Sequence, residues 1–137
     1  MVRIERKIEI KSSQKKVFAI LDEPEKFPIW NITVNAVDII EPKKKGFVKT
    51  TVGNFTSTRS KTVENKSISY DIDGGVFNKM GYTLIAKGGG TEVTLWAEFD
   101  DASQEKILLK AGEVLLNSLK KYAEYIEGGG NPAEYKK

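Results

Sequence analysis

Any chemistry in this chain would rest on tyrosine, carboxylate and arginine side chains, because the sequence contains no histidine and no cysteine. That composition excludes disulfides, thiolate nucleophiles, Cys/His zinc sites and Ser-His-Asp or Cys-His catalysis. A catalytic hypothesis would use Tyr70 or Tyr82 as proton donor and Asp71 or Glu98 as base, stabilised by Arg59. Each carboxylate alternates with the apolar residues of its own strand, so we expect both to face solvent. Catalysis by these residues is therefore the weaker hypothesis.

The glycine triplet at 88–90 has two interpretations. A phosphate-binding loop would need the N-terminus of a helix directly after it, and the residues that follow alternate like a strand. The triplet instead predicts a hairpin turn.

The charges of the chain indicate a mixed, solvated surface. Its 22 basic and 19 acidic residues give a net charge of +3 and are interspersed, so we expect no nucleic-acid partner. No segment approaches the roughly 20 apolar residues of a membrane span, and the amino-terminal residues contain no apolar run. We expect a cytoplasmic protein of undetermined oligomeric state, with no integral membrane segment, metal or cofactor.

A half-buried strand is predicted at the amino terminus, where Val2, Ile4, Ile8 and Ile10 share one parity that Arg6 interrupts. Further strands, separated by short turn sequences, are predicted at 34–41, 47–52, 55–63, 67–72, 77–87 and 92–99. Connections this short cannot hold crossover helices, so the strands should form an antiparallel meander.

The strand at 55–63 is unusually polar, and three arrangements are open. If the parity of Phe55 faces inward, Arg59 faces inward too and can bind an acidic group. If the other parity faces inward, Thr58 and its neighbours present hydroxyls, and Thr50 carries the same ambiguity. The third arrangement is a rim strand with solvent on both faces.

Two short helical segments are predicted between the first two strands. Ser12 or Ser13 can cap the first, and Pro24 ends it, because the residue before a proline is forced out of the helical region. A second turn at 24–27 should be stopped by Pro28.

One long amphipathic helix is predicted from Ser103 onwards, capped by Asp101 or Ser103 itself. Its apolar residues recur at three- and four-residue spacing: Ile107, Leu108, Ala111, Val114, Leu115, Leu119, Tyr122, Ala123 and Ile126. Glycines 128–130 end it. We expect one domain at 1–127 and a flexible tail at 128–137.

Several segments give the chain a family resemblance. They are Val-Phe-Ala-Ile-Leu-Asp at 17–22, Pro-Glu-Lys-Phe-Pro-Ile-Trp-Asn at 24–31, and the strand with Val37 and Ile39. With the order of elements over 2–127, they resemble the START-like or Bet v 1-like superfamily, also called SRPBCC, which includes polyketide cyclase/dehydrase-like proteins. The resemblance implies an α+β helix-grip fold, in which a seven-stranded curved antiparallel sheet wraps around the long C-terminal helix, with two short helices after the first strand.

The resemblance also implies a hydrophobic cavity between sheet and helix, where members bind lipids, sterols, polyketides or quinones and a minority catalyse cyclisation or dehydration. We expect a small hydrophobic or amphipathic ligand here. The alternatives are a polyketide cyclase or dehydratase, and a co-chaperone-like interaction module using an outer sheet patch around Trp96. The candidate cavity residues, which alternatively fill a solid core, are Trp30, Thr50, Arg59, Tyr70, Met80, Tyr82, Leu84, Leu95, Phe99, Leu108, Ala111 and Leu115.

Overall fold

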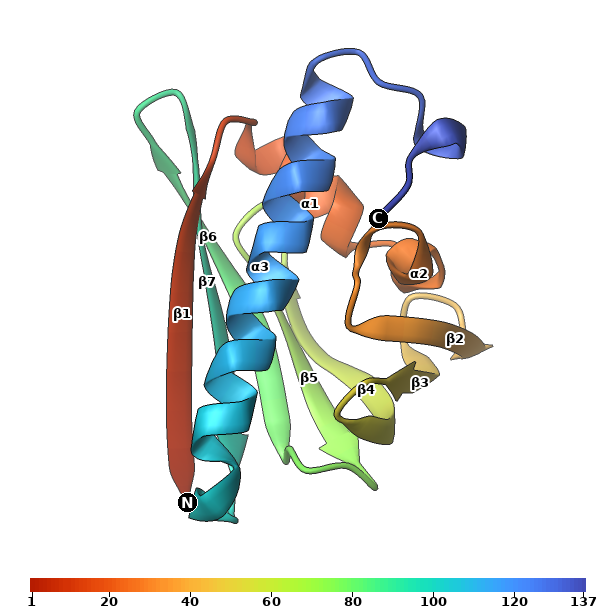
Figure 1. Cartoon of the computed structure of the whole chain (residues 1–137), viewed down its shortest axis with the longest axis vertical. Helices are drawn as coiled ribbons and strands as arrows, with labels where there is room; N and C mark the ends of the chain where they lie inside the picture. The colour runs from red at the N-terminus through yellow and green to blue at the C-terminus, as the bar shows by residue number, and fades with distance from the viewer.

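The computed structural model describes residues 1–137 and contains one seven-stranded antiparallel sheet (Figure 1). The strands are β1 (Val2–Ile10), β2 (Val34–Glu41), β3 (Lys45–Thr50), β4 (Gly53–Val63), β5 (Ser67–Asp73), β6 (Lys79–Lys87) and β7 (Gly90–Phe99). Their order across the sheet is β1-β7-β6-β5-β4-β3-β2, so β2 to β7 form the predicted meander. The first strand closes the arrangement by pairing with the last, which leaves β1 and β2 as the two edges.

Turn chemistry explains the strand boundaries. At the β6–β7 hairpin, Gly88 and Gly89 both have positive φ, 57° and 82°, the conformation that a tight two-residue turn requires. The hairpin interpretation of the triplet is therefore confirmed. Register is continuous between β1 and β7, from Val2 opposite Phe99 to Ile10 opposite Thr91.

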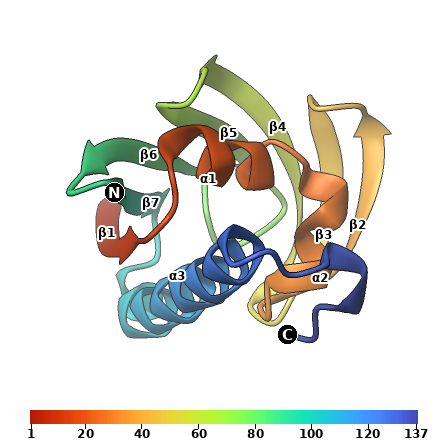
Figure 2. The same cartoon turned by 90° about the horizontal axis from the view of Figure 1, so that it is seen from above.

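A single long helix, α3 (Glu105–Glu127), covers the concave side of the sheet. Seen from above, the strands curve in an arc from β1 to β2, and α3 occupies the open side of that arc (Figure 2). Its approach is fixed by Asp101, whose carboxylate accepts hydrogen bonds from the Ser103 backbone N–H and hydroxyl at 3.0 and 2.6 Å. None of the helices combines the length and apolar character needed to cross a membrane. This arrangement is the helix-grip fold.

The connection from β1 to β2 contains α1 (Gln14–Leu21), a 3₁₀ turn η1 (Pro24–Lys26) and α2 (Phe27–Trp30). Ser13 caps α1 by accepting a hydrogen bond from the Lys16 backbone N–H. The expectation that Pro28 stops the second turn is wrong: Pro28 lies in the first turn of α2. A proline is tolerated there because the first backbone N–H groups of a helix have no intrahelical partner.

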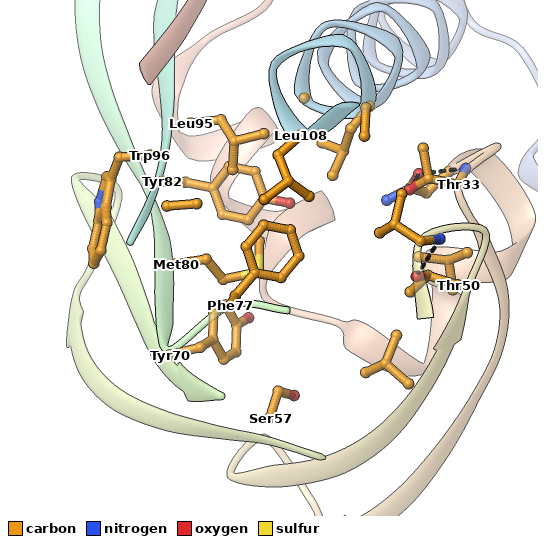
Figure 3. A pocket seen from close by; sticks show the side chains of 18 of the residues that line it. Thr33, Thr50, Ser57, Tyr70, Phe77, Met80, Tyr82, Leu95, Trp96 and Leu108 are labelled. Carbon is orange, nitrogen blue, oxygen red and sulfur yellow. Dashed lines mark hydrogen bonds between the residues drawn. The ribbon is translucent and has the colours of Figure 1, made fainter. Parts of the chain in front are cut away.

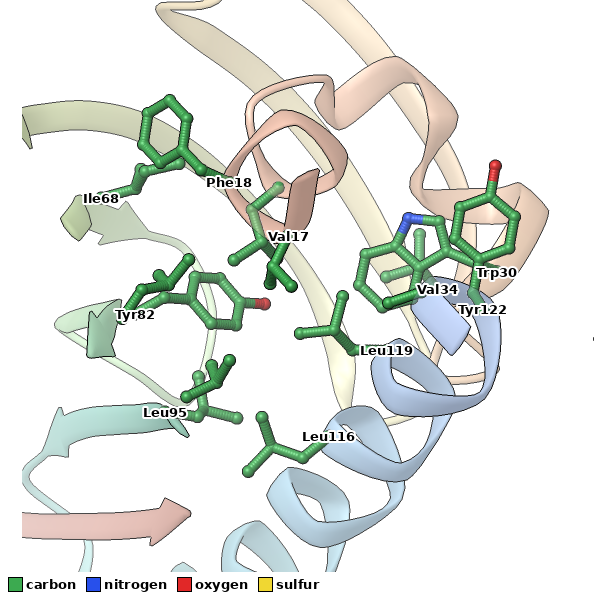
Figure 4. Packing of buried hydrophobic residues seen from close by; sticks show 14 of the residues in the cluster. Val17, Phe18, Trp30, Val34, Ile68, Tyr82, Leu95, Leu116, Leu119 and Tyr122 are labelled. Atoms are coloured by element: carbon green, nitrogen blue, oxygen red, sulfur yellow. The ribbon is translucent and has the colours of Figure 1, made fainter. Parts of the chain in front are cut away.

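The main hydrophobic core lies where α1, α2 and the carboxyl-terminal half of α3 meet over the sheet (Figure 4). Trp30, only 1% exposed, stacks on Tyr122 with ring centroids 6.3 Å apart and meets Phe27 edge-on at 5.5 Å. Val17 and Leu119 are fully buried in the same cluster. Trp30 is therefore part of a packed end of the molecule.

The last ten residues turn back along the molecule towards α2 and β2 (Figure 1). The Tyr135 ring packs against Tyr122 and Tyr125, with centroids 4.8 and 4.9 Å apart. The Lys137 ammonium donates to the backbone carbonyls of Asn31 and Val34 at 3.2 and 2.9 Å. The division into a domain at 1–127 and a flexible tail at 128–137 stays a prediction.

Candidate ligand-binding cavity

A cavity of about 100 Å³ lies between the concave face of the sheet and the amino-terminal half of α3. Sixteen of its 24 lining residues are hydrophobic, which is the composition expected of a site for an apolar ligand. Tyr70, Met80, Tyr82 and Leu95 project into it from the sheet, and Leu108 faces them from α3 (Figure 3).

Eight of the twelve candidate residues from the sequence line this one cavity. They are Thr50, Tyr70, Met80, Tyr82, Leu95, Leu108, Ala111 and Leu115. The structure thus brings together side chains from β3, β5, β6, β7 and α3. Their contact with a ligand stays a prediction.

The other four candidates lie outside the cavity. Trp30 and Leu84 belong to the main core, and Phe99 packs in a second, smaller cluster with Ile4 and Leu108. All three face the apolar interior, but neighbouring side chains pack around them and leave no open space. Arg59 lines a separate, smaller hollow.

Sequence reasoning missed the wall formed by β2, β3 and β4. Val34, Val48 and Phe55 line the cavity, and Val48 lies directly opposite Phe55 in the β3–β4 register. The signal was clear only for Phe55, the buried residue of a strand whose other positions are mostly polar, because β2 and β3 carry further apolar residues that are less buried. Phe77, from the loop between β5 and β6, also enters the cavity and meets Phe55 edge-on at 6.2 Å.

The parity of Phe55 faces inward, as in the first of the three arrangements considered for this strand, since Phe55 is buried and Ser57 lines the cavity, but Arg59 lies in the separate hollow and not at the mouth of the cavity. The Arg59 guanidinium is already paired. Its Nη1 donates to Asp22 Oδ1 at 2.5 Å and its Nη2 to the Asp22 carbonyl at 3.4 Å. Asp22 also accepts from Lys43 Nζ at 2.9 Å. Arg59 therefore ties β4 to the end of α1.

The pKa of Asp22 reflects two opposing influences. Burial alone would raise it, but the hydrogen bonds and positive charges of Arg59 and Lys43 outweigh burial and hold the pKa below its usual value. The carboxylate is thus ionised at neutral pH, and its charge is matched by these two cations.

Three hydroxyls offer unused hydrogen-bonding capacity at the cavity. The Tyr70 hydroxyl is buried and has no partner, and the Tyr82 and Ser57 hydroxyls make no hydrogen bond to another residue. Thr33 and Thr50 also line the cavity, but they donate to Asn31 Oδ1 and the Gly53 carbonyl at 2.7 and 2.6 Å. Tyr82 and Ser57 are the polar groups available to a ligand, whereas the Tyr70 hydroxyl is fully covered and lies close to Arg59.

Burial raises the pKa of both cavity tyrosines, and at Tyr70 the positive charge of Arg59 opposes the increase. Both phenols are therefore neutral hydrogen-bond donors at ordinary pH. Neither proposed base accompanies them: Asp71 is exposed, and Glu98 accepts a hydrogen bond from Arg3 at 3.0 Å. The expectation that these carboxylates face away from the apolar side agrees with this geometry.

Trp96 is among the residues that line the cavity, but its ring lies on the outer face of the sheet (Figure 3). The Arg3 guanidinium lies 4.6 Å from its ring centroid, and the ring covers Gly81, where a Cβ would stand 2.7 Å from Trp96 Cζ2. A cation–π contact and close packing over a glycine account for the position of this side chain.

A curved antiparallel sheet that grips one long helix around an apolar cavity defines a START-like protein. The chain belongs to the family described as polyketide cyclase / dehydrase and lipid transport, whose model matches residues 1–124. Among functionally curated proteins, no sequence matches this chain.

Several solved structures share the fold. A START superfamily protein from Mycobacterium smegmatis is similar with a TM-score of 0.80 and 16% identity, over 90% of this chain and 98% of that one. The Zhui aromatase/cyclase from Streptomyces sp. R1128 has a TM-score of 0.80 and 14% identity, over 95% and 99% of the two chains. Aha1 from Colwellia psychrerythraea, solved as a dimer, has a TM-score of 0.69 and 19% identity, over 90% and 97%. At these identities the likeness concerns the fold.

Proposed function

We propose that the protein binds a small hydrophobic or amphipathic molecule in the cavity between the sheet and α3. The observation that carries this proposal is an apolar cavity whose wall also holds the Tyr82 hydroxyl, which makes no hydrogen bond to another residue. A buried polar group without a partner costs free energy, and a ligand oxygen or nitrogen would supply the missing bond. Family membership supports the same role.

Cavity size limits which ligand fits without rearrangement. Ligand pockets typically occupy roughly 300–1,000 Å³, whereas this cavity measures about 100 Å³. An engineered apolar cavity of about 150 Å³ in another protein accommodates benzene. The present conformation therefore suits a short alkyl chain or a compact ring, and a larger ligand must displace side chains.

Two lining side chains are suited to such a displacement. Phe77 is half-buried and lies in the loop between β5 and β6, outside any strand. Met80 is also half-buried, and its unbranched side chain adapts to irregular spaces. Rotation of Phe77 and Met80 would enlarge the cavity without moving the sheet or α3.

Filling the cavity tests the proposal. Ala111→Leu adds three carbon atoms from α3 into the space, whereas the matched control Ala86→Leu makes the same change at an exposed position of β6. Binding of 1-hexanol is followed by ¹H–¹⁵N NMR titration, and native mass spectrometry of the freshly purified protein detects any retained compound. We expect wild type and Ala86→Leu to bind alike and Ala111→Leu to bind at least about tenfold more weakly. Equal binding by Ala111→Leu would show that the alcohol binds elsewhere.

Cyclase or dehydratase activity is a weaker candidate. Tyr70 and Tyr82 could donate protons, but both proposed bases point away from the cavity, and Glu5, which also lines it, pairs with Arg3 at 3.2 Å. An interaction surface around Trp96 is weaker too, because Arg3 and Gly81 explain the placement of that side chain.

A further inference from the structure

One charged residue occupies an inward position of the sheet. On β1, the side chains of Ile4, Ile8 and Ile10 face α3, and Arg6 takes the same parity, opposite Leu95 of β7. The Arg6 stem crosses to α3, because its Cγ lies 3.7 Å from where a Cβ on Gly112 would stand. Arg6 lines the cavity and is also exposed to solvent. Its side chain therefore connects the cavity wall with the outside along the seam between β1 and α3.

The Arg6 guanidinium has no partner within the protein. It takes part in no ion pair and no side-chain hydrogen bond, whereas nearby carboxylates are engaged elsewhere: Glu5 with Arg3 at 3.2 Å, Glu9 with Lys87 at 2.8 Å and Glu113 with Lys110 at 3.7 Å. Arg6 is also the one cationic residue among those that line the cavity. Five N–H donors and a full positive charge are thus free at its edge.

Packing alone does not account for an arginine at this position. A long stem can cover apolar surface while its charged end stays in water. An aliphatic residue of the same parity, however, would bury more apolar area between Leu95 and Gly112 and continue the pattern of Ile4 and Ile8. An aliphatic residue would not supply a positive charge, so the charge is what distinguishes Arg6 at this position.

We propose that Arg6 binds the carboxylate of an amphipathic monocarboxylic acid whose apolar part enters the cavity. This inference rests on the proposed binding function and specifies the chemical class of the ligand. The planar guanidinium matches a carboxylate through two parallel hydrogen bonds. A phosphate monoester fits less well, because the cavity presents no second cation for its second charge.

A pair of probes with the same alkyl chain isolates the contribution of Arg6. Hexanoate and 1-hexanol are titrated separately into the protein at pH 7 and about 0.15 M salt, where exposed charges are screened, with ¹H–¹⁵N NMR as the readout. The comparison variants are Arg6→Gln, Arg6→Met, which retains an apolar stem, and the control Lys7→Gln, which removes the same charge from an exposed residue of the outward parity.

The measured quantity is the ratio of hexanoate affinity to 1-hexanol affinity. We expect Arg6→Gln and Arg6→Met to lower this ratio about tenfold, the usual effect of losing a charge-assisted hydrogen bond. Any change in the cavity wall that affects both probes alike cancels in the ratio. Lys7→Gln should leave the ratio within about twofold of wild type.

The possible failures are distinguishable. If 1-hexanol binds and Ala111→Leu weakens it, but the Arg6 variants keep the wild-type ratio, the carboxylate site is refuted and the binding function stands. If neither probe shifts the resonances of cavity residues, both proposals are overturned. Equal reductions of the ratio in Lys7→Gln and Arg6→Gln would show only a general effect of net charge and would also refute the specific site.

Discussion

The ion pair between Asp22 and Arg59 should contribute measurably to stability, and Asp22→Asn tests this. Asparagine keeps the size of the side chain and the backbone hydrogen bond from Asp22 N–H to the Phe18 carbonyl, but it removes the charge. The Arg59 side chain is 10% exposed and that of Asp22 21%. Exposed pairs contribute roughly 0.2–1 kcal/mol, and breaking a buried pair costs roughly 3–5 kcal/mol. We expect an intermediate loss of about 2 kcal/mol in the free energy of unfolding.

The orphaned cation causes most of this loss. Arg59 Nε is already buried without a partner, and in the variant the guanidinium would also lose its counter-charge. A double-mutant cycle with Arg59→Met should therefore show that the two substitutions together cost less than the sum of the single changes. Urea denaturation followed by circular dichroism at pH 7 measures the free energy of unfolding of each variant. In thermal denaturation, the melting temperature of Asp22→Asn should fall by about 5–10 °C.

The effect should depend on pH in a defined direction. The pKa of Asp22 is lowered in the folded protein, so its contribution is fully present above the unfolded-state pKa, near about 3.9, and is lost as the pH falls through the lower folded-state value. The difference between wild type and Asp22→Asn should shrink below about pH 4. As a control, Lys43→Gln removes a 60% exposed partner of the same carboxylate and should cost less than about 0.5 kcal/mol. A loss in Asp22→Asn no larger than that of Lys43→Gln would refute the reasoning.

Two further predictions concern close packing. Gly81→Ala should destabilise the protein by about 2 kcal/mol in urea denaturation, because its Cβ would stand 2.7 Å from the Ile68 carbonyl oxygen. The matched control is Gly46→Ala, whose Cβ would meet its nearest atom at 3.5 Å. Equal effects of the two substitutions would contradict the steric argument. Deleting residues 131–137 removes the contacts of Tyr135 and Lys137 and should lower the free energy of unfolding by about 1–2 kcal/mol; an unchanged value would support the flexible tail expected from the sequence.

The alternation of residues in the sequence was sufficient to predict the sheet. Charged and apolar residues alternate in β1 except at Arg6, and short turn sequences separate the later strands, so the meander follows from local rules. Pro28 was misjudged because a proline that stops a helix from its interior is compatible with the first turn of a new one. The prediction of the strands and the error at Pro28 both concern local backbone conformation, which depends on residues close in sequence.

The cavity could be predicted only in part, because parity specifies the face of a residue and not its height along the fold. Leu84 and Leu95 both lie on the inner face, yet Leu84 is surrounded by the main core and Leu95 borders empty space. The pairing of Arg59 with Asp22 spans 37 residues and has no local signal. Trp30, predicted to line the cavity, lies instead in the packed core, and Phe77 lines the cavity without having been predicted. Both positions depend on contacts between residues distant in sequence.

The pairing of β1 with β7 has a consequence for how the chain folds. Val2 and Phe99 are partners across almost the whole sheet-forming sequence, whereas every other strand pairs with its neighbour in the chain. During synthesis the first strand leaves the ribosome long before its partner β7 exists. The successive hairpins from β2 to β7 can form before β1 pairs. Pairing of such distant segments is slow, because a large loop must close first. The alternating charges of β1, besides facing solvent in the finished sheet, would keep this waiting strand from pairing with other chains.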